Sequence, residues 1–169
     1  MTSTESVKEL TDSMKFNDGV LNVTLTDMTD ELARRQLRNG GPSIAWGIGH
    51  LLYHRNKIAA AMSVAGPAFD LDRYATSATD GRDYPTLREL RAAWTQLSAG
   101  LMSALERSTP GQLAAPSPIA LPHGEQTLLD ALRFTVWHET FHVGQVSLLR
   151  SHHGLIPTAT LVTQAAAAH

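Results

Sequence analysis

Residues 137–155 read WHETFHVGQVSLLRSHHGL, and this stretch decides the fold of the chain. Apolar residues recur at helical spacing through it and through the segment just before it, at Leu128, Leu132, Val136, Val143, Val146 and Leu149. The pattern predicts a helix that begins near Glu125 and ends at Gly154, because glycine commonly follows the last turn of a helix. A long helix with one apolar face has to bury that face against other helices.

Two earlier segments show the same periodicity. The first runs from about residue 4 to 28 and carries a stripe of apolar residues that Asn17 interrupts: Val7, Leu10, Met14, Leu21, Leu25 and Met28. The second follows a glycine- and proline-rich turn, with Ser43 as its expected N-cap, and runs to about Met62. Both segments therefore predict amphipathic helices.

A further helix is predicted from the capping-box pattern of Thr86 and Glu89 to the turn at residues 109–111. Long connections lie on both sides of this helix. One spans residues 63–85, and the other is a proline-rich stretch that contains Pro110, Pro116, Pro118 and Pro122. Such loops can act as lids or binding loops, or can simply cross over the fold. We expect an all-α protein with a single four-helix bundle, one domain over residues 1–169, and a frayed tail after about residue 157.

Composition excludes several classes of protein. The 169 residues include no cysteine, so disulfides, thiolate metal sites and a cysteine nucleophile are all excluded. The net charge of −2 argues against nucleic-acid binding, because the Lys and Arg residues are scattered. No apolar run reaches the roughly 18 residues that a membrane span needs. The polar N-terminus shows no secretory signal, so we expect a cytoplasmic protein.

Four of the eight histidines form two matched pairs. His138 and His142 are four residues apart, so their side chains emerge on one helix face about 6 Å apart. His50 and His54 have the same spacing on another predicted helix. Two such imidazoles can bind one ion at roughly 2.0–2.1 Å, and a third ligand should come from a facing helix. We expect one divalent metal ion on His138, His142 and a third histidine, and periodicity alone does not choose between His50 and His54.

Residues 138–142, HETFH, match the H-E-x-x-H motif of zinc metalloproteases, in which the glutamate is the general base. Peptidase activity is not expected, because residues 143–169 contain no Asp or Glu and the metzincin extension is absent. Glu139 falls in the middle of the apolar face, where an unpaired carboxylate is costly. It can be a partner of a metal ligand, a fourth ligand, a base, or the partner of an arginine such as Arg55 or Arg133.

With these residues, the chain resembles the DinB-like (YfiT-like) family of metal-binding four-helix bundles. Residues 42–55, PSIAWGIGHLLYHR, are similar to the family's Ser-(Ile/Val)-x-Trp-x-x-x-His opening of helix two. Residues 137–155 are similar to its His-x-x-x-His-x-Gly-Gln-(Ile/Leu) run in helix four. Together with the helix order and loop lengths, the resemblance covers nearly the whole chain.

The resemblance implies roles for individual residues. His50 becomes the third metal ligand, and His54 becomes a pocket residue that, like Glu139, can assist proton transfer. Gly144 would permit a close approach of helices, and Gln145 would satisfy polar groups of the backbone or of a ligand.

The same resemblance implies where a bound molecule lies. Helix one commonly faces the site in the family, which makes Asn17 a pocket candidate. Arg73 and Tyr74 lie in the long loop at residues 63–85 and are further candidates to contact a bound cofactor.

Family members include thiol S-transferases, which use bacillithiol, mycothiol or glutathione, and a thiol-dependent maleylpyruvate isomerase. Three neutral imidazoles leave positions open at which zinc or nickel can lower the pKa of a thiol. We therefore expect a metal-dependent enzyme, a homodimer, that transfers a low-molecular-weight thiol to a small-molecule substrate. The alternatives are a non-catalytic metal- or ligand-binding dimer and a metal-dependent hydrolase.

Overall fold

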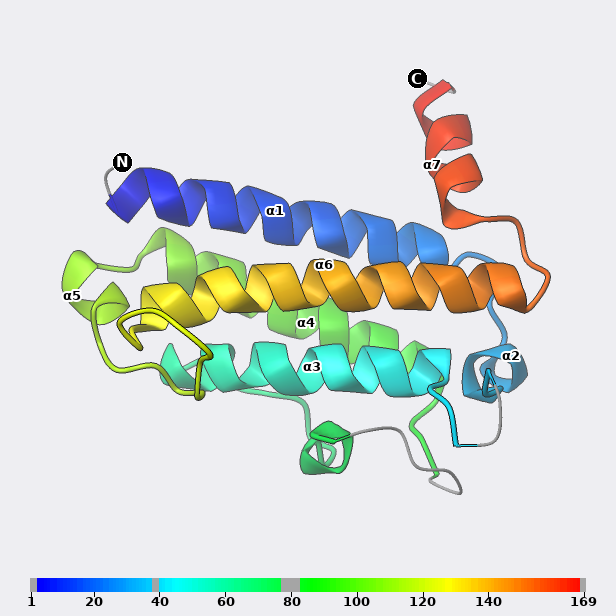
Figure 1. Cartoon of the computed structure of the whole chain (residues 1–169), viewed down its shortest axis with the longest axis horizontal. Helices are drawn as coiled ribbons and strands as arrows, with labels where there is room; N and C mark the ends of the chain where they lie inside the picture. The colour runs from blue at the N-terminus through cyan, green and yellow to red at the C-terminus, as the bar shows by residue number, and fades with distance from the viewer. Residues whose placement is uncertain (1–2, 38–39, 77–82, 168–169) are drawn as a thin grey trace.

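The computed structural model describes residues 3–37, 40–76 and 83–167, and this part of the chain is all-helical (Figure 1). The predicted domain also includes residues that lie outside the described part of the chain, namely 1–2, 38–39, 77–82 and 168–169. Of these, residues 77–82 belong to the predicted loop at residues 63–85. The helices are α1 (Ser3–Thr24), α2 (Asp30–Arg34), α3 (Ile44–Ala61), the 3-10 helix η1 (Asp72–Tyr74), α4 (Leu87–Glu106), α5 (Pro110–Leu113), α6 (Leu128–His152) and α7 (Thr158–Ala167).

The four long helices are those that the apolar periodicity predicts, and three of them begin at side-chain caps. The Ser43 hydroxyl accepts a hydrogen bond from the Trp46 amide at the start of α3. Thr86 and Thr127 form complete capping boxes at the starts of α4 and α6. Because each cap satisfies backbone amides that have no partner within the helix, it determines where the helix begins.

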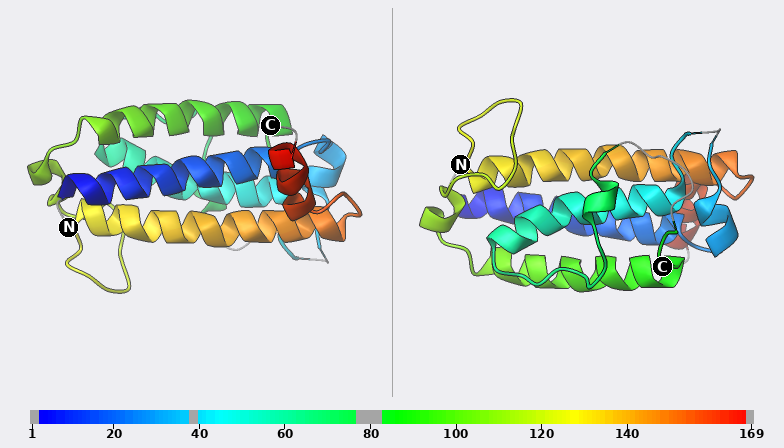
Figure 2. Two further views of the ribbon diagram at one scale, coloured as in Figure 1. Left: turned by 90° about the horizontal axis from the view of Figure 1, so that it is seen from above. Right: turned by 90° about the horizontal axis from the view of Figure 1, so that it is seen from below.

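The contacts between the long helices define their arrangement. Helix α6 packs against α1 and α3, and α4 also packs against α3 and α1. Figures 1 and 2 show that α1 and α6 run in one direction and that α3 and α4 run in the other. Two parallel neighbours such as α3 and α4 need a connection that returns along the helix. The described parts of the loop at residues 63–85 provide this return, and η1 packs against α3 on the way. This loop is therefore a crossover.

The structure differs from the prediction at both ends of the chain. Helix α1 ends at Thr24 rather than near residue 28, and Asp27 has a positive φ of 56°, which is incompatible with a continuing helix. The Ala-rich tail after about residue 157 was predicted to fray. In the structure, residues 158–167 form α7, which packs against α1 and α6. Arg150 anchors the start of this segment, because its guanidinium donates hydrogen bonds to the Ile156 and Thr24 carbonyls.

The interior is apolar at both ends of the long helices. One cluster of buried side chains includes Leu21, Ile44, Ile48, Leu51, Leu90, Leu97 and Val146. The other includes Met14, Ile58, Leu101, Leu105, Leu128 and Leu132. Among the described residues, no helix combines the length and the hydrophobicity that crossing a membrane requires.

Candidate metal centre

Three histidines converge where α3 and α6 run side by side in opposite directions. One nitrogen from each of His50, His138 and His142 lies within 4.8 Å of the corresponding atoms of the other two. His50 and His138 are buried, and His142 is half-buried. This group can hold a metal ion, and His50 occupies the third position that periodicity alone left open.

A hydrogen bond outside the cluster orients the His50 ring. Its Nδ1 lies 2.7 Å from the backbone carbonyl of Tyr74 and must donate the proton, because a carbonyl only accepts. His50 Nε2 is then free to face His138 Nε2, which is 3.2 Å away. Two nitrogens bound to one ion at tetrahedral geometry are about 3.3 Å apart. The spacing of these two atoms therefore fits a shared metal ion.

Burial keeps these imidazoles uncharged. Burial, together with the neighbouring histidines, lowers the pKa of His138 to about 3. It also lowers the pKa of His142 to about 4, against the opposing effect of a hydrogen bond with Gln145. Burial also lowers the pKa of His50. Near neutral pH, each ring therefore offers a lone pair to a metal, and imidazole donors suit zinc, nickel, iron and copper.

The stability of the metal-free protein should fall as the pH decreases from about 7 to about 4. In the unfolded chain these histidines take up protons near pH 6.5, whereas burial lowers the pKa of His54 and His142 to about 4 in the folded protein. The unfolded state then binds more protons, so acid favours unfolding. Each unit of pKa difference corresponds to about 1.4 kcal/mol. Urea unfolding across this pH range, with a chelator present, measures the slope of the free energy of unfolding against pH. An equally steep slope in the double variant His54→Gln/His142→Gln would contradict this assignment.

Glu139 is paired with Arg55, one of the partners that the sequence left open. Arg55 Nε and Nη2 lie 2.7 and 2.6 Å from the two Glu139 carboxylate oxygens, and both side chains are 0% exposed. Because both oxygens face the guanidinium, Glu139 does not present a free carboxylate to the histidines. Its expected use as a base or as a ligand therefore has no support in this arrangement.

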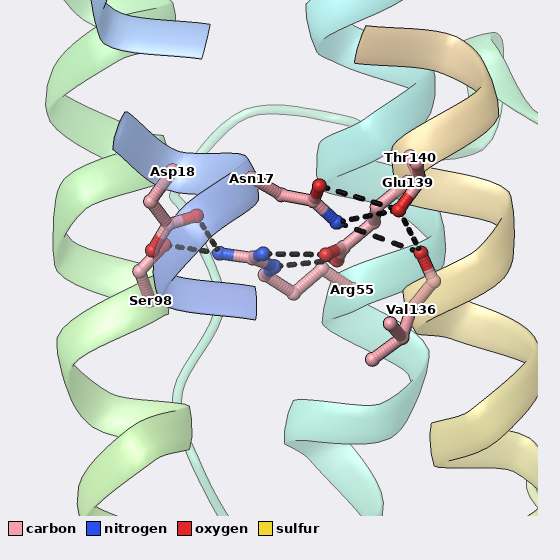
Figure 3. A network of polar contacts seen from close by, with 7 residues as sticks. All are labelled: Asn17, Asp18, Arg55, Ser98, Val136, Glu139 and Thr140. Carbon is pink, nitrogen blue, oxygen red and sulfur yellow. Dashed lines mark hydrogen bonds and ion pairs between the residues drawn. The ribbon is translucent and has the colours of Figure 1, made fainter. Parts of the chain in front are cut away.

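Arg55 joins all four long helices at this level (Figure 3). From α3 it contacts Glu139 on α6, Asp18 on α1 at 2.7 Å, and the Ser98 hydroxyl on α4. Its guanidinium also lies 3.7 Å from the centre of the Trp94 ring, as a cation–π contact. Arg55 follows His54, and Glu139 follows His138. The ion pair therefore fixes how α3 and α6 are rotated toward each other, and hence where the histidines meet.

Asn17, expected in the pocket, lies instead in the contact between α1 and α6. Its amide donates to the Thr140 hydroxyl at 3.1 Å and lies 3.5 Å from the Val136 carbonyl (Figure 3). It also lies near the buried carboxylate of Glu139, where it opposes the rise of the Glu139 pKa that burial causes. Asn17 therefore belongs to the Arg55 network rather than to the surface that a ligand would reach.

The two candidates in the crossover loop are placed differently from each other. Tyr74 is buried, and its carbonyl holds His50, while its ring stacks on Tyr84 at a centroid distance of 5.8 Å. Arg73 lies over the same two rings, at 5.8 and 5.9 Å. A Cβ added at Gly49 would overlap the Tyr74 ring. The absence of a side chain at Gly49 thus lets η1 reach His50.

Replacing Gly49 with alanine should weaken metal binding by about 10- to 100-fold, the usual effect of removing a partner of a metal-bound histidine. The new methyl group would displace the Tyr74 ring and with it the carbonyl that orients His50. Chelator competition measures the affinity. Gly144→Ala is the matched control, because nothing lies within 4 Å of a Cβ built there. Equal affinities for the two variants would show that the Tyr74 carbonyl does not position His50.

The remaining predicted residues lie around the cluster. The His54 ring centre is 4.1 Å from that of His138 and 4.6 Å from that of His50. Gln145 is exposed and lies near His142, where it opposes the lowering of the His142 pKa. Gly144 is also exposed and has no close neighbour, so the prediction of close helix approach there is wrong. The close approach of α3 and α6 occurs at Gly47, where an added Cβ would lie 2.9 Å from Val146.

Sequence reasoning noted Trp46 beside His50 but missed the aromatic residues of α6 that contact the other histidines. Trp46 stacks on His50 with ring centres 4.7 Å apart and an interplanar angle of 17°. On α6, Phe134 and Phe141 contact His138 and His142 respectively. The signal was present in the spacing of Phe134, Trp137 and Phe141, which places three aromatic side chains along one side of the histidine helix.

Comparison with known protein families identifies the pattern. A family model described as the DinB superfamily matches residues 17–146, which include all three histidines of the cluster. No match was found among curated proteins.

Proposed function

The chain belongs to the DinB superfamily, and from this premise we propose that it is a metal-dependent enzyme, built as a single four-helix bundle, that transfers a low-molecular-weight thiol to a small-molecule electrophile. The observation that carries the proposal is the set of three neutral imidazoles from His50, His138 and His142. Three protein ligands leave coordination positions open, as in catalytic rather than structural metal sites.

A bound zinc or nickel ion would lower the pKa of a coordinated thiol and so supply a thiolate at neutral pH. The chain has no cysteine of its own, so the sulfur has to come from a molecule such as mycothiol, bacillithiol or glutathione. The role of the protein is to hold the ion with neutral ligands in a half-buried site. His50 is oriented by the Tyr74 carbonyl.

His54 is the proposed proton acceptor for the incoming thiol. It is half-buried, and its Nδ1 has no hydrogen-bond partner among the described residues. Burial and the neighbouring histidines lower its pKa to about 4, so the ring is neutral at pH 7 and its Nδ1 can accept a hydrogen bond from the thiol. Its ring lies against those of His50 and His138. Glu139 has a different role in this proposal, because its pairing with Arg55 positions α6.

The second candidate is a non-catalytic metal-binding bundle, and one observation favours it. The short ring-centre distances from His54 to His50 and His138 would let a small rotation bring a fourth imidazole onto the ion. Four protein ligands make a closed site, which is typical of structural zinc. In this reading the protein is a homodimer whose metal stabilises the fold.

Thiol-transfer assays separate the two candidates. Zinc- or nickel-loaded protein is incubated with monochlorobimane and each of mycothiol, bacillithiol and glutathione in turn. We expect a metal-dependent rate above the spontaneous reaction with at least one thiol, which His142→Ala abolishes and His152→Ala retains. A rate equal to background with all three thiols, in protein shown to contain the metal, would favour the non-catalytic reading. Hydrolysis of small esters in the same preparation would instead indicate a hydrolase.

A further inference from the structure

An aromatic strip on α6 runs alongside the metal centre, and we define it as Phe134, Trp137 and Phe141. Phe134 stacks on His138 with ring centres 5.8 Å apart and an interplanar angle of 29°. Phe141 meets His142 edge-on at 5.2 Å. Trp137 lies between the two phenylalanines, 5.7 and 6.0 Å from their ring centres. Two of these aromatic side chains thus touch metal-ligand candidates directly.

The strip is unusually open to solvent. Trp137 is 62% exposed and Phe141 is 52% exposed, although large aromatic side chains contribute most to stability when buried. Both lie on the helix that also carries His138 and His142. A cluster of exposed aromatic side chains beside a site that binds small molecules is typical of a binding surface.

One end of the strip forms the wall of a groove. The groove has a volume of about 520 Å³ and lies between the start of α6 and the connection that precedes it. Its apolar lining comes from Phe134 and Trp137 on α6 and from Leu121 and Pro122 in the connection, which also contributes His123 and Gly124. The volume is within the roughly 300–1,000 Å³ of small-molecule sites. Phe134 lines the groove and also stacks on His138, so a single aromatic ring lies between the groove and the metal centre.

The charges in the groove indicate what kind of group it accepts. Its two opposite charges, Arg133 and Asp130, are 3.2 Å apart and compensate each other. Asp130 is also engaged by the Thr127 cap. The groove therefore offers flat apolar surface rather than an excess of charge, and an aromatic ring fits it better than a carboxylate or phosphate.

We propose that this groove binds an aromatic group of the electrophile that the thiol attacks, so that the products carry an aryl group close to the sulfur at the metal centre. The inference rests on the proposed function, because it places one end of the ligand at the three histidines. Stacking on Phe134 and Trp137 would hold the ring, and the Leu121–Pro122 side would cover it. Aromatic contacts of this kind strengthen binding by about threefold to tenfold.

Two thiols that differ only by a phenyl ring test the inference, because the phenyl compound places a ring near its sulfur as such a product does. Ethanethiol and 2-phenylethanethiol are titrated into cobalt-loaded protein, and the sulfur-to-cobalt absorption band reports each dissociation constant. The preference of the parent for the phenyl compound should fall by about threefold to tenfold in Phe134→Leu/Trp137→Leu, while the affinity for ethanethiol stays the same. Phe16→Leu is the matched control, because Phe16 is 70% exposed on α1 and outside the groove.

Three results would overturn the inference, and a fourth would overturn the proposed function separately. An unchanged preference in the double variant would show that the groove does not hold the ring. A parent dimer that the double variant converts to a monomer in sedimentation would assign the strip to a second copy of the chain. If neither thiol produces the absorption band, the thiol proposal fails. The dissociation constants of acetohydroxamate and benzohydroxamate, which also differ by a phenyl ring, are then compared. If the parent shows no preference for the aromatic compound, the groove does not bind the ring either.

Discussion

Replacing Arg55 with methionine should lower the free energy of unfolding by about 3–5 kcal/mol, the usual cost of removing one partner of a buried ion pair. The large effect follows from what remains behind. Glu139 would keep a carboxylate that is 0% exposed, and burial already raises the pKa of this group. Asp18, whose side chain is 19% exposed, would lose its partner as well.

Urea unfolding of the parent and of two variants measures this effect. Lys57→Met is the matched control on the same helix, because its ion pair with Asp72 is exposed and 3.7 Å long. Exposed pairs contribute about 0–1 kcal/mol, so this change should be small. The double variant Arg55→Met/Glu139→Leu should recover part of the loss, because it removes the buried charge together with its partner. A loss below about 1 kcal/mol for Arg55→Met would contradict the structural role of the pair.

Replacing His138 with alanine should weaken metal binding by more than about 100-fold, a larger effect than the loss of an outer partner of a metal ligand. His138 is buried at the centre of the cluster, with its Nε2 3.2 Å from that of His50. Two remaining imidazoles make a poor site. His50→Ala and His142→Ala should have comparable effects, whereas His54→Ala should retain most of the affinity.

Competition with a chromophoric chelator measures these affinities, and thermal unfolding provides an independent reading. Metal at 100 times its dissociation constant stabilises a folded protein by about 2.7 kcal/mol, and this gain should disappear in His138→Ala. His152→Ala is the control, because His152 is exposed at the far end of α6. If His54→Ala lost as much affinity as His138→Ala, the site would have four protein ligands and the non-catalytic reading would gain support.

The long helices could be predicted because their apolar faces and caps are local features of the sequence. Short-range rules predict the caps at Ser43 and Thr86 and the end of α6 just before Gly154. The structure confirms all three. The short helix α2 was not predicted, although Thr29 caps it through the Leu32 amide. A five-residue helix is too short for its periodicity to stand out.

The site was only partly predictable for a different reason. The i, i+4 histidine pairs are local, but the choice of His50 depends on how α3 and α6 are rotated against each other, which the Arg55–Glu139 pair determines. The contact between Tyr74 and His50 joins a loop to a helix 24 residues away, and no spacing rule encodes it. The likeness to a family, rather than periodicity, therefore selected His50 in advance.

The central claim is that His50, His138 and His142 hold one metal ion, and anomalous diffraction from crystals of zinc-loaded protein tests it most directly. The account predicts a single strong peak at the zinc edge between α3 and α6, within about 2.0–2.1 Å of one nitrogen of each histidine. A peak elsewhere, such as at the neighbouring His152 and His153, or no peak in protein loaded with zinc, would contradict the account and leave the three histidines as packing residues.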